Sequence, residues 1–82
     1  MLLEEIAAEI LIKYKKFPHK EGALAALKSE FNSHFPRSQY DRWAKTEIPE
    51  SLSQNIVATV GKNRDVSIRF IIKDLDIISK TI

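Results

Sequence analysis

Three prolines, Pro18, Pro36 and Pro49, divide the first part of the chain into short segments. The residue before a proline avoids the α region of conformational space, so a helix normally ends at or before that residue. No linker, internal repeat or low-complexity tract separates the segments. The prolines therefore predict three short helices joined by tight corners, and they exclude a long helix before Pro49.

The first segment has the charge order and the apolar period of a helix. Its glutamates come early and its lysines late, which suits the helix dipole, and Glu9 and Lys13 form a favourable pair one turn apart. One apolar stripe repeats at helical spacing: Leu3, Ile6, Ala7, Ile10, Tyr14 and Phe17. We therefore expect a helix over residues 2–16, with Ile12 exposed on the opposite side.

The next two segments predict helices with one apolar side each. Over residues 19–35 the apolar side consists of Leu24, Leu27, Phe31 and Phe35. Residues 36–49 have room for only a short helix, which Ser38 could cap at its N-terminus together with Asp41. The inward side of that helix would carry Tyr40, Trp43 and Ala44, and the outward side Arg42 and Lys45.

The stretch after Pro49 admits two interpretations. β-branched residues are frequent in it, and apolar and polar residues alternate from Val66 to Ile72, as in a half-buried strand, except at Ile71. A hairpin at about residues 55–72 would follow the three helices. That order is typical of a winged-helix-like α+β domain.

Caps and spacing favour helices instead. Ser51 and Gln54 form a capping-box pattern, and Gly61 stands where a helix commonly ends in a left-handed residue. Asn63 or Asp65 could cap a following helix. Its apolar stripe keeps the helical period to the last residue: Ile68, Ile71, Ile72, Leu75, Ile78 and Ile82. We therefore predict an all-α fold, a compact bundle of four to five short helices, with the winged-helix-like domain as the alternative.

Under the helical interpretation, residues 56–75, "IVATVGKNRDVSIRFIIKDL", have the layout of a helix-turn-helix element. A small-residue helix leads to a glycine corner, a polar segment and a second helix anchored by isoleucines. The N-terminal part of the second helix contacts DNA in such elements. The candidate DNA contacts are Lys62, Asn63, Arg64, Arg69 and Lys73, with the asparagine and Arg69 best suited to base edges. Asp65, Asp74 and Asp76 place negative charge near this surface and count against the hypothesis.

A protein partner is the alternative to DNA. The segment "HFPRSQYDRW", residues 34–43, mixes aromatic and basic residues, the types that dominate interface hot spots. The candidate contacts for an acidic protein partner are Arg37, Tyr40, Arg42 and Lys45. Trp43 is the only tryptophan, and we expect it to anchor the core. Ile77, a spare apolar residue on the last helix, would suit a homodimer.

The composition is that of a globular domain. Of the 82 residues, 44% are hydrophobic and 29% are charged, which argues against disorder. Thirteen basic side chains against eleven acidic ones give a net charge of +2, which is compatible with nucleic acid without requiring it. We expect residues 1–82 to form a single small helical domain, which could be one domain of a longer protein.

The sequence contains no recognisable catalytic or metal-binding motif. It has no cysteine, His19 and His34 lack the spacing of metal ligands, and no carboxylate or serine stands in a catalytic pattern. No apolar run approaches the roughly 20 residues of a membrane span, and the first residues do not resemble a secretory signal. We therefore expect a non-enzymatic binding module in the cytoplasm, without cofactor, metal or membrane contact.

Overall fold

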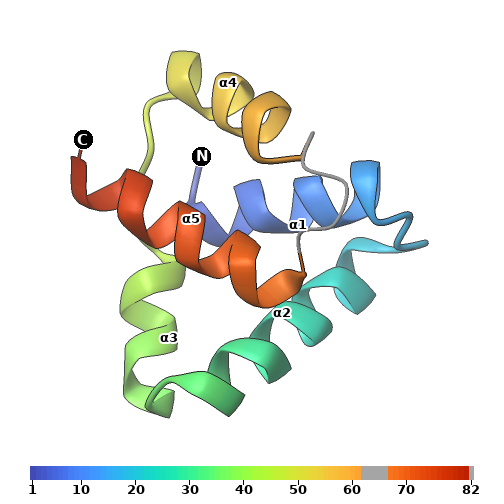
Figure 1. Ribbon diagram of the computed structural model, residues 1–82, viewed down its shortest axis with the longest axis vertical. Coiled ribbons are helices and arrows are strands. Elements are labelled where there is room, and N and C mark those ends of the chain that lie inside the picture. Colours follow the sequence, from blue (N-terminus) through green and yellow to red (C-terminus); the bar gives the residue numbers. More distant parts are fainter. Residues whose placement is uncertain (62–66, 82) are drawn as a thin grey trace.

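The computed structural model describes residues 1–61 and 67–81, and this part of the chain is almost entirely helical (Figure 1). Its helices are α1 (Leu3–Tyr14), α2 (Lys20–His34), α3 (Arg37–Ala44), α4 (Glu50–Gly61) and α5 (Ile68–Thr81). The described ranges contain no strand apart from an isolated bridge between Leu2 and Glu47. The all-α prediction is confirmed. The hairpin alternative is wrong for the described residues, because residues 55–61 belong to α4 and residues 68–72 to α5.

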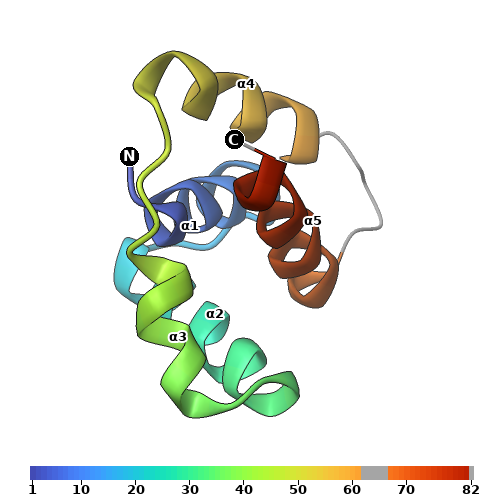
Figure 2. The ribbon, with the colours of Figure 1, turned by 90° about the vertical axis from the view of Figure 1, so that its left-hand side faces the viewer.

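Helix α1 lies at the centre of the bundle, and each of the other four helices packs against it. Figures 1 and 2 show α4 on one side of α1, α2 and α3 on the opposite side, and α5 alongside. The buried residues of α1 are Leu3, Ile6, Ala7, Ala8, Ile10 and Leu11. This band is broader than the predicted stripe because Ala8 and Leu11 are buried as well. The helix is also shorter at both ends than the expected 2–16.

Backbone hydrogen bonds join the start of the chain to the connection between α3 and α4. The N–H of Leu3 donates to the carbonyl of Thr46 (2.9 Å), and the N–H of Ile48 donates to the carbonyl of Met1 (2.9 Å). The amino group of Met1 donates back to the carbonyl of Ile48 at 2.9 Å. The side chain of Ile48 is buried in the core. These contacts fix the C-terminal end of α3 relative to α1.

The apolar sides of α2 and α5 face the core, as predicted. In α2 the buried residues are Ala23, Leu27 and Phe31, and the half-buried Leu24 and Phe35 pack against them. In α5 the buried residues are Ile71, Ile72 and Leu75, and Ile68 and Ile78 are half-buried beside them. Ile82, the last member of the predicted stripe, lies outside the described residues.

The side-chain caps expected at Ser38 and Ser51 are wrong. Helices α3 and α4 begin directly after a proline, so each serine lies inside the first turn. The carbonyl of Pro36 accepts the N–H of Gln39, and the carbonyl of Pro49 accepts the N–H groups of Leu52 and Ser53. The fixed φ of proline is compatible with a helix start. The helices therefore begin earlier than the capping patterns indicate.

Gly61 also differs from its expected role. It is the last residue of α4, and neither glycine of the chain has a positive φ, so the left-handed helix end is wrong. Its role is in packing, because a Cβ at this position would collide with the ring of Tyr14 on α1. Glycine thus lets the end of α4 approach α1. The other two capping candidates, Asn63 and Asp65, lie outside the described residues.

We expect Gly61→Ala to lower the free energy of unfolding by about 1 kcal/mol or more, because the added methyl group must displace the Tyr14 ring. Gly22→Ala is the matched control: no atom lies within 4 Å of its added Cβ. This control should gain about 0.5–1 kcal/mol, since alanine is the better helix former. Urea unfolding measures both shifts, and stabilisation of both variants alike would contradict the packing role of Gly61.

Candidate functional site

An aromatic cluster holds α3 against α2. Phe31 of α2 contacts Tyr40 and Trp43 of α3, and it also contacts Phe35, which directly follows α2; the paired rings have centroids 4.8–6.2 Å apart. A helix of eight residues is not stable by itself, so the place of α3 depends on this packing. Trp43 is only 7% exposed, which confirms its expected role as a core anchor.

Tyr40 was a candidate partner contact, but the structure places it in the core. Its hydroxyl donates a hydrogen bond to the carboxylate of Glu4 on α1 (3.1 Å), and the ammonium group of Lys28 lies 5.7 Å from its ring centroid. Burial raises the pKa of Tyr40 to about 12, with further contributions from the charge and hydrogen bond of Glu4 and the charge of Asp41. Tyr40 therefore joins α3 to α1.

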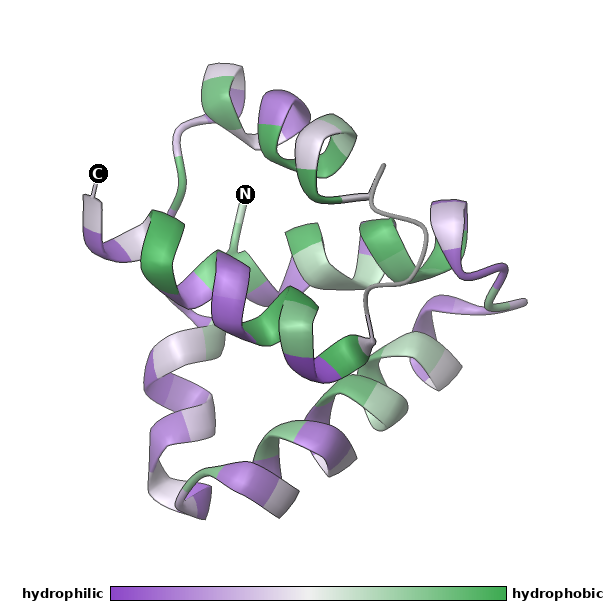
Figure 3. Cartoon of the chain, in the orientation of Figure 1, coloured by the Kyte–Doolittle hydropathy of each residue, from purple (hydrophilic) through white to green (hydrophobic). Residues whose placement is uncertain are grey.

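The outward side of α3 carries the other three predicted partner contacts, Arg37, Arg42 and Lys45. All three are exposed, and none forms an ion pair with another described residue. Asp41 is the acidic residue exposed on the same helix. Figure 3 shows α3 as largely hydrophilic along its length. The two-residue corner 35–36 separates it from α2. The sequence therefore predicted the orientation of this helix correctly.

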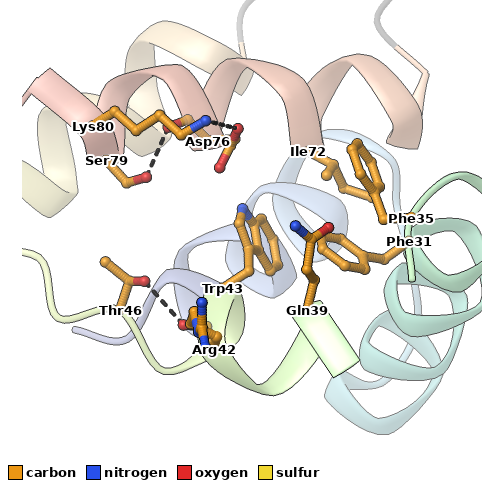
Figure 4. Close-up of a pocket in the computed structure, with 10 residues that line it drawn as sticks. All are labelled: Phe31, Phe35, Gln39, Arg42, Trp43, Thr46, Ile72, Asp76, Ser79 and Lys80. Atoms are coloured by element: carbon orange, nitrogen blue, oxygen red, sulfur yellow. Dashed lines mark hydrogen bonds and ion pairs between the residues drawn. The ribbon is translucent and has the colours of Figure 1, made fainter. Parts of the chain in front are cut away.

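A pocket of about 430 Å³ lies between α3 and α5, with the aromatic rings of α2 and α3 on one side (Figure 4). Polar side chains of α5 line the other side, where Lys80 pairs with Asp76 (3.2 Å). The indole Nε1 of Trp43 is buried at this pocket and has no hydrogen-bond partner among the described residues. Figure 4 shows that nitrogen turned toward α5. Arg42 lines the same pocket, so the outward side of α3 continues into it.

The structure does not bring together all the predicted DNA contacts of the C-terminal half. Arg69 and Lys73 are exposed on α5. Lys62, Asn63 and Arg64 lie outside the described residues. Six residues, 62–67, separate α4 from α5, whereas a helix-turn-helix corner has about three to four. The hypothesis of DNA contact through this half of the chain stays a prediction.

The outward side of α5 holds a feature that the sequence interpretation only partly identified. Phe70 is 55% exposed and Ile77 is 62% exposed. The sequence predicts Ile77 as a spare apolar residue on the last helix. Phe70, by contrast, belongs to the strand-like alternation of apolar and polar residues. The helical period alone places Phe70 away from the core stripe, on the same side as Ile77.

Within residues 1–61 and 67–81, no three histidine, aspartate or glutamate side chains are grouped so that they could hold a metal ion. Over the same residues, no helix combines the length and the apolar character needed to cross a membrane.

Comparison of the chain with protein-family models, with curated proteins and with solved structures gives no match.

We expect ionisation of the Tyr40 phenol to lower the free energy of unfolding at high pH. Its pKa is about 12 in the folded chain and 10.0 for an ordinary tyrosine, so the folded state holds the phenolic proton more tightly than the unfolded state. The stabilising contribution is complete below pH 10 and is lost as the pH rises toward 12. Urea unfolding across this range should show a steeper decline for the wild type than for Tyr40→Phe. Parallel declines in the two proteins would contradict the role of Tyr40.

Proposed function

We propose that this chain is a non-enzymatic, intracellular DNA-binding module that contacts the duplex through α3. One observation carries the proposal: Arg37, Arg42 and Lys45 are exposed on the outward side of α3 and have no ion-pair partner among the described residues. Unpaired surface cations can neutralise phosphates and release the counterions around them. That release supplies much of the affinity of proteins for DNA.

The way α3 follows α2 supports a contact in the major groove. In helix-turn-helix proteins the second helix lies in this groove, and residues near its N-terminus reach the base edges. Helix α3 follows a short corner, its aromatic side is packed against α2, and its opposite side faces solvent. Ser38 and Arg42 stand one turn apart on the exposed side and are the candidates for base edges. Arg37 and Lys45 are the candidates for phosphates.

The side chains of α5 make it the weaker candidate for the interface. Arg69 and Lys73 are exposed there, but so are Phe70 and Ile77, which gain nothing from contact with phosphate groups. Helix α3 exposes no large apolar side chain. An acidic protein is the alternative partner, and it would use the same three cations of α3.

We expect the purified chain to bind a short DNA duplex with an affinity that falls steeply with salt. Fluorescence anisotropy of a labelled duplex at several salt concentrations gives the slope of log K against log salt, about −0.9 for each phosphate contacted. Lys45→Ala should reduce the magnitude of that slope by about 1, because it removes one phosphate contact. Arg42→Ala should cost about 1–3 kcal/mol of binding free energy, because it removes a base contact.

Arg69→Ala is the matched control, because it removes an exposed cation from α5 and leaves α3 intact. Weakened binding in this variant, with unchanged binding in the α3 variants, would move the interface to α5. A wild-type chain that binds no duplex even at low salt would reject DNA. An acidic protein would then be the partner to test.

A further inference from the structure

Phe70 and Ile77 form an exposed apolar pair on α5. They are 55% and 62% exposed and stand seven residues, about two helical turns, apart on the same side of the helix. Among the described residues, one other large apolar side chain is exposed, Ile12 on α1 at 38%. Covering these two side chains with another apolar surface would be favourable, because it removes their apolar area from water.

Opposite charges stand between the two apolar residues. Lys73 is exposed, Asp74 beside it is half-buried, and neither forms an ion pair with another described residue. Lys73 follows Phe70 by three residues, and Asp74 precedes Ile77 by three residues. The order along the helix is therefore apolar, positive, negative, apolar. When this order is placed against its own reverse, apolar residues meet apolar residues and opposite charges meet.

A cavity lies next to Ile77. It measures about 210 Å³ and is lined by Thr59 and Val60 of α4 and by Asp74, Ile77 and Ile78 of α5. The lining is mainly aliphatic, which suits an apolar side chain. The apolar pair on α5 thus has a recess beside Ile77 at one end. At the other end, the ring of Phe70 is exposed.

From these three features we infer that two copies of the chain associate through α5, packed antiparallel about a two-fold axis that passes between Lys73 and Asp74. Two positions that meet across this axis have residue numbers with the same sum, as 70 and 77 or 73 and 74 do. Phe70 therefore meets Ile77 of the second copy, and Lys73 meets Asp74 of the second copy. The Phe70 ring comes over the cavity beside Ile77, and the same contact occurs twice because the interface is isologous.

The charges disfavour the parallel arrangement. A parallel pair of α5 helices would place Lys73 against Lys73 and Asp74 against Asp74, and like charges at a helix interface are unfavourable. The contact area sets the strength of the dimer. A single helix side is smaller than the roughly 800 Å² per partner of a standard interface, so we expect reversible association. This inference does not depend on DNA binding, because the axis and its contacts lie on α5.

Sedimentation velocity over a series of protein concentrations, without nucleic acid, tests the association. The wild type should shift from monomer to dimer as concentration rises. Phe70→Ser and Ile77→Ser should each weaken dimerisation about tenfold or more, since each loses its apolar contact on both sides of the axis. Ile12→Ser is the matched control and should leave dimerisation unchanged. Circular dichroism checks that every variant keeps its helices.

A charge exchange tests the register. Lys73→Asp alone and Asp74→Lys alone place like charges opposite each other across the axis and should weaken the dimer. The double variant, carrying both substitutions, restores opposite charges in each pair and should dimerise like the wild type. A wild type that stays monomeric at all concentrations would overturn the inference. So would a double variant that fails to recover while its helix content is intact, or an Ile12→Ser variant as weak as Phe70→Ser.

Discussion

The burial of α1 is the constraint on which the rest of the structure depends. Half of its twelve residues are buried, and each of the other helices packs against it. Ala7 and Ala8 lie in the middle of this band, and their small side chains let neighbouring helices approach closely. None of the surrounding helices is longer than 15 residues, and helices of that length are marginal in water without tertiary packing. A polar substitution in the buried band of α1 would therefore weaken contacts to several helices together.

The sequence was sufficient to predict the helices but not their caps. Prolines and apolar periods placed the first three helices to within a few residues, because both signals are local. After Pro49 a hairpin stayed as the alternative, and of the caps and the spacing that favoured helices there, the apolar spacing is the signal that the structure confirms. The caps predicted at Ser38 and Ser51 do not form because the helices begin directly after Pro36 and Pro49, which leaves both serines inside the first turn. The left-handed helix end predicted at Gly61 is wrong for a non-local reason. The glycine's lack of a side chain makes room for Tyr14, which lies far away in sequence, and no pattern around residue 61 reveals that contact.

Some features of the candidate site were likewise predictable from the sequence, and others were not. The inward and outward sides of α3 follow from a helical period, so the exposure of Arg42 and the burial of Trp43 were predictable. The exposure of Phe70 was equally available from the period of α5, and the strand-like run of residues around it obscured the signal. The hydrogen bond from Tyr40 to Glu4 and the unpartnered indole nitrogen of Trp43 were not predictable, because they depend on how α3 meets α1 and α5.

Helices α3 and α5 offer different chemistry to a partner, and this difference is the basis for the different roles proposed for them. Unpaired cations on α3 suit a polyanion, whereas the apolar pair on α5, with its opposite charges between, suits a copy of itself. The two roles are compatible in size. The chain measures 29 × 28 × 21 Å, and in two copies joined through α5 the separation of equivalent points is twice their distance from the two-fold axis. Successive major grooves on one side of a duplex lie about 34–36 Å apart, which is the spacing that dimers of helix-turn-helix proteins use. That spacing lies within the range of separations that a two-fold dimer of a chain of this size allows.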